Sequence, residues 1–405
     1  MKILQVNNVD LLGSRFNNYN MIAKQNQLGV RVKQLVLDKF SASSYVSSIK
    51  LPDAIHSEIS KLEKERDVRC LFFPYAERIL ESPQFKEADI VHYHLLHNEM
   101  CSIFDLPRLF SAKKSVWTIH DPWILTGHCI YPLECNKYFY GCGNCPDLTR
   151  NFAIKEDSTK VMWNIKRKVF EKISIPLIVS SNWMKNMIED SPFGKYFPTI
   201  YKIPFGIDLT TFKPIPNNEK KALRDKFGFS DRFTILFRED PSPYKGLDLI
   251  IEALLKLNVK EKINIITVGT KNFLPTSLFE RFNIRQFGWV VSEEEMARLY
   301  AMSDVFLMPS TAESFGVMGI ESLACGVPLI TRKNTAVDEV TNGGEVSIIF
   351  STCEELKEKI ELLYKNPLYR KLISEKSIKF ANDNFSEDRY HNELINLYDN
   401  LLRQG

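Results

Sequence analysis

The sequence predicts an α/β protein made of two doubly wound, Rossmann-like domains. Short apolar runs of strand length alternate with amphipathic helical segments in both halves of the chain, which is typical of parallel sheets covered by helices. A stretch rich in proline and glycine near mid-chain indicates a boundary between the halves. The length of 405 residues allows two to three domains of ordinary size, and two fit this pattern best.

The first half opens with one complete strand–helix–strand unit. Residues 3–6 are an apolar run, residues 19–28 have helical periodicity that ends at Gly29, and residues 30–37 alternate as a second strand. Such a unit implies a parallel sheet with ligands at the carboxyl ends of its strands. Further buried strands are expected at residues 90–94, 115–119 and 176–180.

The second half repeats this order. Helices are expected at residues 247–257, 293–302 and 320–324, between strands at 234–237, 263–268, 305–308 and 327–331.

The boundary between the halves is expected near residues 203–218, where three prolines and one glycine fall within residues 204–216. We predict a first domain at 1–207, a second at 208–385 and one amphipathic helix in the segment 386–405. Two such domains would leave a cleft between them, which is where ligands bind in this kind of architecture.

Composition excludes several other classes of protein. The hydrophobic fraction of 44% and the charged fraction of 25% are those of a globular protein. No apolar run approaches the roughly 18 residues of a membrane span, and the first residues turn polar too early for a signal peptide. We therefore expect a cytoplasmic protein with reduced cysteines.

Net charge gives little information as a sum. A value of +3 is too small to indicate a nucleic-acid binder. Residues 1–207 hold 27 Lys and Arg against 21 Asp and Glu. This excess would suit an anionic membrane surface or a phosphate-bearing ligand, and ordinary scatter explains it equally well.

The segment from Pro309 to Pro328 is the most informative part of the sequence. It places a glycine-bearing loop between an expected strand and the start of a helix, whose free backbone N–H groups would bind a phosphate. Gly316 would let the backbone approach that anion. Glu313 and Glu321, with seven residues between them, would accept hydrogen bonds from ring hydroxyls on either side. This pattern indicates a nucleotide-sugar site; two surface glutamates on an ordinary strand–loop–helix are the alternative.

This segment resembles the signature of the retaining glycosyltransferases of family 4, which have the GT-B fold of two Rossmann-like domains facing across a cleft. Their pattern is Glu, seven residues and Glu around Phe-Gly, followed by Ala-Cys-Gly-Val-Pro. The resemblance extends over essentially the whole chain, more loosely over the first 90 residues, and departs at Phe205, where Asn is usual. Further landmarks are residues 180–183, 203–208, 212–214, 237–238, 244–247 and 304–310.

The resemblance implies roles for residues of the second domain. Arg238 and Lys245 would hold the donor diphosphate and stabilise the charge that develops on it. Many relatives hold this pair closer together than Arg238 and Lys245 stand here, and a solvated basic loop is the alternative. Glu321 would bind the ribose and Glu313 the transferred sugar. Donor contacts are also expected from Ser314, Phe315, Gly316 and Val317.

In the first domain, the resemblance directs attention to His120 and Asp121. The family has a His-Asp here that faces the donor sugar, so His120 would contact a sugar hydroxyl or the reacting centre; a structural histidine is the alternative. Asp121 would orient His120 or cap the next turn. Gly13 and Arg15 follow the first strand, where Gly13 would contact the donor and Arg15 a phosphate. His92, His94 and His97 fit local structure better than catalysis, although His94 would also suit the cleft.

The expected reaction is transfer of a hexose from a UDP- or GDP-sugar to a hydroxyl with retention, catalysed by His120, Glu313, Arg238 and Lys245. The sequence contains no Asp-x-Asp, no G-x-G-x-x-G and no Walker sequence, which argues against metal-dependent glycosyl transfer, dehydrogenase and P-loop chemistry. No carboxylate nucleophile can be nominated, so front-face attack without a catalytic cofactor is expected.

The acceptor implied by the resemblance is a saccharide or lipid-linked saccharide of a bacterial capsule, O-antigen or exopolysaccharide. Association with the inner face of the cell membrane is left open, and no nucleic-acid partner is expected. The alternatives are another GT-B enzyme, such as a nucleotide-sugar epimerase or a phosphorylase, and a non-catalytic, zinc-stabilised interaction protein.

Half of the eight cysteines gather between positions 129 and 145. Four thiols over so short a stretch of a cytoplasmic chain favour a structural Zn²⁺ site over disulfides, with free core thiols or redox pairs as alternatives. A capsule-associated branch of the family carries a similar insertion after its His-Asp. The expected ligands, within an insertion at about residues 126–150, are Cys129, Cys135, Cys142 and Cys145.

Overall fold

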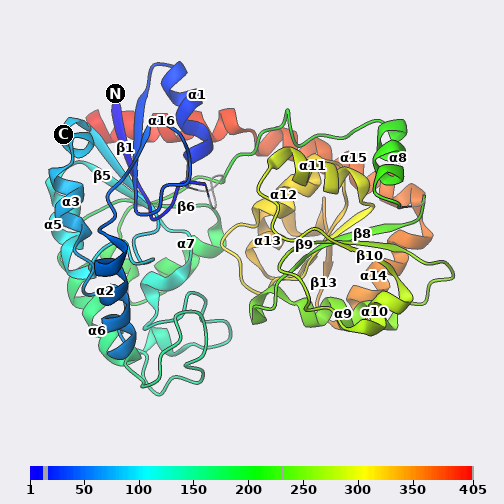
Figure 1. Ribbon diagram of the computed structural model, residues 1–405, viewed down its shortest axis with the longest axis horizontal. Coiled ribbons are helices and arrows are strands. Elements are labelled where there is room, and N and C mark those ends of the chain that lie inside the picture. The colour runs from blue at the N-terminus through cyan, green and yellow to red at the C-terminus, as the bar shows by residue number, and fades with distance from the viewer. Residues whose placement is uncertain (12–16, 230, 404–405) are drawn as a thin grey trace. The chain divides into compact units, whose positions relative to one another are not determined.

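The computed structural model describes residues 1–11, 17–229 and 231–403. Gly13 and Arg15 lie outside these residues. The chain divides into two compact units (Figure 1). Unit 1 is Met1–Pro204 together with the segment that begins at His391, and unit 2 is Phe205–Tyr390.

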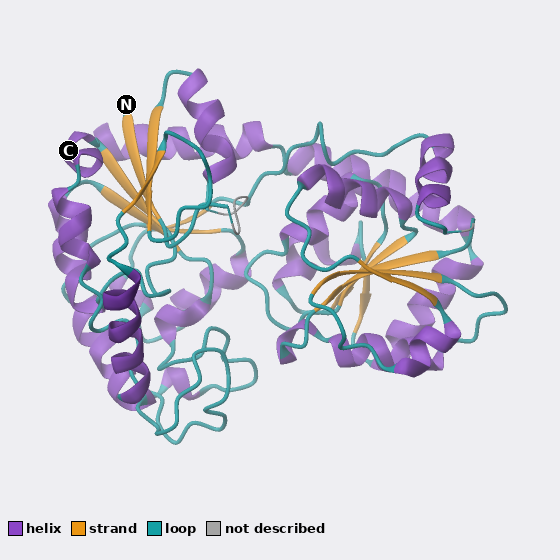
Figure 2. Ribbon diagram, in the orientation of Figure 1, coloured by secondary structure: helices purple, strands orange, loops and turns teal. Residues whose placement is uncertain are grey.

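Unit 1 is built on a parallel sheet whose described strands follow the order β3-β2-β1-β4-β5-β6-β7. Helices cover both faces of this sheet (Figure 2). The strands are β1 Lys2–Val6, β2 Arg31–Val36, β3 Val46–Ser48, β4 Ile90–Tyr93, β5 Ser115–Thr118, β6 Leu177–Val179 and β7 Ile200–Lys202. The α-helices are α1 Tyr19–Gln27, α2 Asp53–Glu65, α3 Tyr75–Glu81, α4 Pro83–Glu87, α5 Leu106–Ala112, α6 Thr159–Phe170 and α7 Asn182–Glu189.

Unit 2 has a second parallel sheet, in the order β10-β9-β8-β11-β12-β13. The strands are β8 Thr234–Glu239, β9 Asn264–Gly269, β10 Asn283–Gln286, β11 Val305–Met308, β12 Leu329–Arg332 and β13 Ile348–Phe350. Its helices are α8 Asn217–Lys226, α9 Leu247–Lys256, α10 Thr276–Arg281, α11 Glu293–Met302, α12 Val317–Ala324, α13 Ala336–Val340, α14 Cys353–Lys365 and α15 Pro367–Asn384, followed by α16 Glu387–Arg403, which continues into unit 1.

These two sheets confirm the predicted α/β class. Every strand expected from an apolar run is present, because central strands of a parallel sheet are buried on both faces and therefore read as continuous apolar sequence. The sequence did not indicate β3, β7, β10 and β13. All four are short, and all four lie at a sheet edge, where pairing with one neighbour stabilises a strand of weak pattern.

The segment expected as the linker is fastened to the start of α16 within unit 2. The Ile207 N–H donates to the Phe385 carbonyl at 2.8 Å, and the Glu387 N–H donates to the Ile207 carbonyl at 3.1 Å. A Cβ at Gly206 would lie 2.6 Å from the Ser386 carbonyl oxygen, so only glycine fits this approach.

The end of α16 packs within unit 1. The Tyr398 hydroxyl lies 2.6 Å from Nδ1 of His92, and Lys114 donates to the Leu401 and Leu402 carbonyls at the helix end. A lysine at this position satisfies otherwise unpaired carbonyls and complements the helix dipole.

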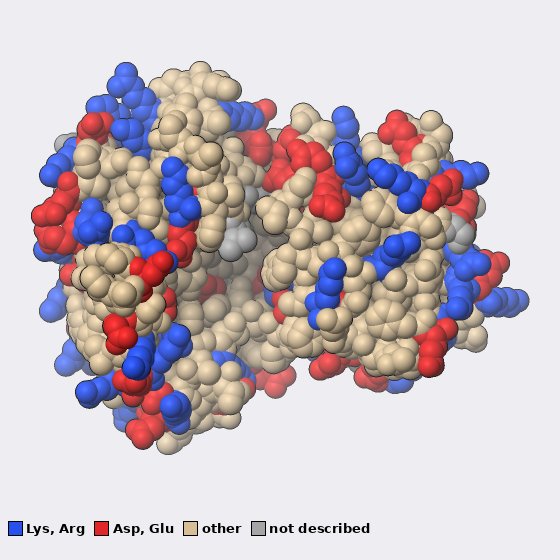
Figure 3. All heavy atoms as spheres, viewed as in Figure 1, with Lys and Arg blue, Asp and Glu red and all other residues tan. Residues whose placement is uncertain are grey.

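Surface charge is mixed on the face drawn in Figure 3, where basic and acidic side chains are interspersed over each unit. Among the described helices, none combines the length and the apolar character that crossing a bilayer requires.

Candidate functional site

Arg238 stands at the carboxyl end of β8, the edge at which parallel sheets bind ligands. Its Nη2 lies 2.8 Å from Oδ2 of Asp240, and its guanidinium lies over the Trp289 ring, 5.1 Å from the centroid. Burial opposes ionisation of Asp240, but hydrogen bonds from Ser242 and the nearby charges of Arg238 and Lys245 lower the pKa of its carboxyl. The arginine is thus held in place by a carboxylate and an aromatic face.

Lys245 and Glu313 form an ion pair between two neighbouring loops, one after β8 and one after β11. Their side chains are 13% and 17% exposed, so both are largely shielded from water. The Ser310 hydroxyl donates to Oε1 of Glu313 at 3.3 Å. The Thr311 N–H donates to the Tyr244 carbonyl at 2.8 Å and joins the two loops. Two motifs far apart in sequence therefore meet at one edge of the unit 2 sheet.

Packing within unit 2 explains why Phe and Gly stand at positions 315 and 316, and the sequence did not indicate this. Phe315 is 2% exposed and packs edge-on against Phe205 and Phe385 at ring distances of 5.3 and 5.9 Å. Gly316 has φ of 95°, and a Cβ there would lie 2.8 Å from Cγ2 of Val337. Both constraints demand glycine at the position preceding α12.

The start of α12 offers backbone donors. Gly316 occupies the N-cap position and brings no side-chain hydrogen bond to the helix. The first N–H groups of a helix have no intrahelical acceptor, so those that begin at Val317 are suited to an anion. Ser314 belongs to the same loop, between the ion-paired Glu313 and the buried Phe315.

Glu321 points into the interior of unit 2. It is 0% exposed, and its Oε2 lies 3.1 Å from the hydroxyl of Tyr300 on α11. The alternative of two surface glutamates is therefore wrong for this segment, because Glu313 is ion-paired and largely covered and Glu321 is fully buried.

In unit 1, a set of histidines surrounds the predicted His120–Asp121 pair. Nδ1 of His94 lies 3.1 Å from Nε2 of His120, and His94 also stacks on His92 at 4.2 Å. Burial lowers the pKa of His120 to about 4, although Asp121 opposes this shift. His120 is therefore neutral near pH 7, and it acts there as a hydrogen-bonding group rather than a cation.

Asp121 has two partners. Its Oδ2 lies 3.1 Å from Nε2 of His97, and its Oδ1 accepts from the Trp123 N–H at 3.0 Å, which caps the turn Pro122–Leu125. His97 also stacks on Trp123 at 4.7 Å. The capping role named for Asp121 is thus observed, and His97 and His94 contact the pair directly. The only signal for these contacts in the sequence was the position of both histidines after a strand.

All four clustered cysteines line one small cavity in unit 1, together with His128. None of the eight cysteines forms a disulfide. In the part of the chain that the structure describes, no group of three His, Cys, Asp or Glu side chains is already gathered as a metal centre.

Comparison with known proteins finds a family match within unit 2. Residues 219–380 match the family model "Glycosyl transferases group 1". The chain is 22% identical to the putative colanic acid biosynthesis glycosyl transferase WcaC of Escherichia coli (strain K12), over 77% of this chain and 76% of the relative. It is 26% identical to the alpha-monoglucosyldiacylglycerol synthase of Acholeplasma laidlawii, over 81% and 79% of the two chains.

Solved structures agree over the full length. HepE of Anabaena, in complex with UDP and glucose, matches with a TM-score of 0.71 at 16% identity, over 99% of this chain and 100% of that one. The sucrose-phosphate synthase of Thermosynechococcus elongatus matches with a TM-score of 0.70 at 15% identity, over 100% of both chains. Residues 219–380 thus match the glycosyl transferases of group 1, and the two units of the chain have the GT-B fold.

Proposed function

We propose that this protein is a retaining hexosyltransferase that moves a hexose from a nucleoside-diphosphate sugar to a hydroxyl acceptor. The observation that carries the proposal is the meeting of Arg238, Lys245 and Glu313 at the carboxyl edge of the unit 2 sheet, beside the start of α12, where Gly316 brings no side-chain cap. The match of residues 219–380 to a glycosyltransferase family model supports the reaction type. The donor, the retention of configuration and the independence from metal are part of the proposal.

The two cations would stabilise the leaving nucleoside diphosphate. Negative charge grows on this group as the glycosidic bond breaks, and fixed cations near it lower the barrier. Without a ligand, Arg238 pairs with Asp240 and Lys245 pairs with Glu313. A diphosphate would therefore take Lys245 from Glu313 and release that carboxylate toward the hydroxyls of the transferred sugar.

The remaining assignments complete the donor site. Backbone N–H groups from Gly316 and Val317 would bind phosphate oxygens, and Ser314 would lie beside them. Glu321 would accept from the ribose hydroxyls, which requires its buried carboxylate to exchange Tyr300 for the ribose. His120, neutral near pH 7, would hydrogen-bond the sugar, and the leaving phosphate would take the acceptor proton in front-face attack.

The proposed acceptor is a saccharide or lipid-linked saccharide of a bacterial surface polysaccharide. Two relatives are named for colanic acid and for a glucosyldiacylglycerol, which are a polysaccharide and a glycolipid. The excess of Lys and Arg in residues 1–207 would suit a phosphate-bearing lipid carrier at the inner face of the membrane.

A donor screen tests the proposal. Purified protein is mixed with UDP- and GDP-hexoses, and binding is measured by calorimetry and thermal stabilisation; one nucleotide family should bind well above the others. The anomeric configuration of a product made on a synthetic saccharide is then read by NMR. If no nucleotide-sugar binds, the proposed glycosyltransferase function is wrong. Conversion of the donor without an acceptor would favour an epimerase, and an inverted product would remove retention.

A further inference from the structure

The segment 126–158 of unit 1 has little regular secondary structure and few buried apolar side chains to stabilise it. It contains no α-helix and no strand, and its one helical turn is Lys137–Phe139. Its buried hydrophobic side chains are Tyr138 and Ile154, each 8% exposed. Irregular segments of this length are uncommon in compact domains unless something besides a core fixes them.

The thiols of this segment line a single cavity. Cys129, Cys135, Cys142 and Cys145 all contribute to its wall, and its volume is about 20 Å³. A space of this size holds one water-sized guest. The cavity is therefore matched to a single ion and is too small for an organic ligand.

The backbone between the last two thiols turns sharply. Gly141, Cys142, Gly143 and Asn144 have φ values of 104°, 55°, 85° and 47°. Left-handed residues such as Cys142 and Asn144 are unfavourable unless the surroundings compensate for them. This turn lies between Cys142 and Cys145 in a C-x-x-C, the spacing common in zinc sites.

His128 provides an independent sign of a ligand at this cavity. It is 3% exposed and lines the cavity. Its Nε2 lies 3.3 Å from Sγ of Cys145, while its Nδ1 is buried with no hydrogen-bond partner. A buried polar atom without a partner costs free energy, which a bound ligand or a local rearrangement would recover.

We propose that Cys129, Cys135, Cys142 and Cys145 bind one structural Zn²⁺, and that His128 positions Cys145 by donating from Nε2 to its sulfur. Four thiolates in tetrahedral geometry suit Zn²⁺ above other divalent ions. No three ligands among the described residues are yet gathered around one point, so the ion would draw the sulfurs inward across the cavity.

The proposed ion would also steady the neighbouring His-Asp loop. Lys166 on α6 donates to the carbonyls of Trp123 and Thr126 at 2.5 and 2.8 Å, and it lies 3.4 Å from the Trp123 ring centroid. The Gly143 N–H donates to the Thr159 hydroxyl at 2.9 Å, which ties the thiol turn to the start of the same helix. Helix α6 thus connects the thiol segment with the turn that follows Asp121.

Metal content of the full chain, purified in reductant without added metal, tests the proposal. We expect about one equivalent of zinc by mass spectrometry of the element, released when the thiols are modified. Cobalt exchanged into the protein should give the thiolate charge-transfer absorption of a four-sulfur site. Less than about half an equivalent, or a disulfide among the four cysteines in peptide mapping, overturns the proposal.

Variants assign the ligands. Cys142→Ser and Cys145→Ser should lose the zinc, whereas Cys353→Ser, a thiol of unit 2, should keep it. His128→Gln should keep zinc but release it to a chelator roughly tenfold faster. Loss of all zinc in His128→Gln together with full retention in Cys135→Ser would overturn the four-cysteine set. If a cysteine variant fails to fold, the zinc content of the wild-type protein decides the proposal. This measurement does not depend on any nucleotide-sugar assay.

Discussion

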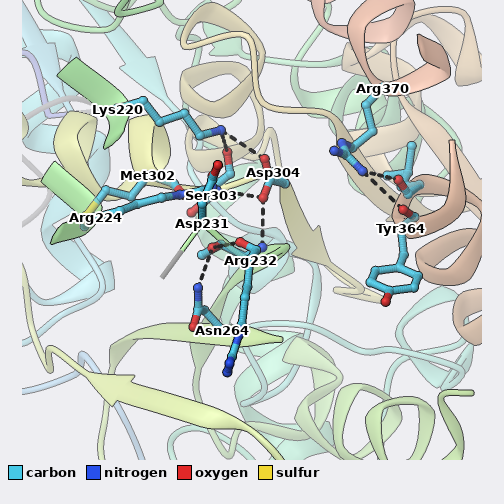
Figure 4. A network of polar contacts seen from close by, with 12 residues as sticks. Lys220, Arg224, Asp231, Arg232, Asn264, Met302, Ser303, Asp304, Tyr364 and Arg370 are labelled. Carbon is cyan, nitrogen blue, oxygen red and sulfur yellow. Dashed lines mark hydrogen bonds and ion pairs between the residues drawn. The ribbon is translucent and has the colours of Figure 1, made fainter. Parts of the chain in front are cut away.

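Unit 2 contains two charge clusters at opposite ends of the same pair of strands, and they differ in what their charges can still do. The closed cluster consists of Lys220, Arg224, Asp231 and Asp304 and lies where β8 and β11 begin (Figure 4). The open cluster consists of Arg238, Asp240, Lys245 and Glu313 and lies where these strands end.

In the closed cluster, Asp304 uses both carboxylate oxygens in contacts that stabilise the fold. Its Oδ1 accepts from Lys220 at 3.0 Å, and its Oδ2 accepts from Arg224 at 2.6 Å and from the Thr234 N–H at 2.8 Å. Burial opposes ionisation of Asp304, but Lys220, Arg224 and these hydrogen bonds lower its pKa. This carboxylate links α8 to the strands, and both of its oxygens already accept hydrogen bonds from the protein.

In the open cluster, each cation has one carboxylate partner that a phosphate can replace. The comparison teaches that similar ion pairs have different roles at the two edges of the sheet. At the amino edge they stabilise the fold, and at the carboxyl edge we propose that they bind the donor. The difference arises because loops at the carboxyl edge connect strands to helix starts, where backbone donors gather.

The largest expected effect is on stability. Asp304→Ala should lower the free energy of unfolding by about 3–5 kcal/mol, because it leaves the buried Arg224 with only the exposed Asp231 as an ionic partner and Lys220 with none among the described residues. Urea unfolding followed by circular dichroism measures this. Asp231→Ala is the matched control, since Asp231 is 82% exposed and pairs with the same Arg224, and it should change stability by less than about 0.5 kcal/mol. Equal effects of the two variants would contradict the assignment.

The largest effect on activity is expected at the other end of β8. Arg238→Ala should reduce kcat about 10²–10³-fold by removing charge stabilisation from the leaving diphosphate, with little change in unfolding free energy. Steady-state kinetics with the donor found in the screen measures this loss. Arg232→Ala changes an exposed arginine just before the same strand and should be neutral. Unchanged kcat in Arg238→Ala would remove this residue from the site.

Glu321→Ala should weaken nucleotide binding by about 1.5–3 kcal/mol if the carboxylate accepts from the ribose. Calorimetry with the nucleoside diphosphate measures the change. Tyr300→Phe removes only the hydroxyl that contacts Glu321, and it should leave binding within about twofold of the wild type. Wild-type affinity in Glu321→Ala would show that this buried carboxylate serves the fold alone.

Glu313→Gln separates the two proposed roles of Glu313. Loss of its charge frees Lys245, so a nucleoside diphosphate without sugar should bind tighter by up to about 1 kcal/mol, while turnover of the sugar donor falls. Ser310→Ala, which alters only a 3.3 Å hydrogen bond to the same carboxylate, should show neither change. Weaker diphosphate binding in Glu313→Gln would contradict the exchange of partners.

The smallest expected effect is a loss of stability at low pH. Because the pKa of Asp304 is lowered in the folded state, its ion pairs stabilise the fold above a pH of about 4, and this stabilisation is lost as pH falls through the lower folded-state value. The stability difference between the wild type and Asp304→Asn should therefore shrink between pH 7 and pH 3. A constant difference over this range would show that the charge of Asp304 is not what stabilises α8.

Much of the fold could be read from the sequence, and less of the site. Apolar runs predicted the central strands because burial on both faces demands them. The glutamates around Phe315–Gly316 indicated a nucleotide-sugar site in the loop after β11, and that role stays a prediction. Asp240 and Trp289 were missed, since neither lies in a recognisable motif and each matters only through its position against Arg238.

The sequence by itself determined the alternation of strands and helices, the family motifs and the clustering of four thiols. The tertiary structure decided which charges are paired and which side chains are covered: Glu313 contacts Lys245, Glu321 faces Tyr300, and His94 contacts His120. Pattern and residue type are local properties that burial imposes along the chain. Pairing depends on which loops of a parallel sheet end side by side, and strand order sets that only when the sheet assembles.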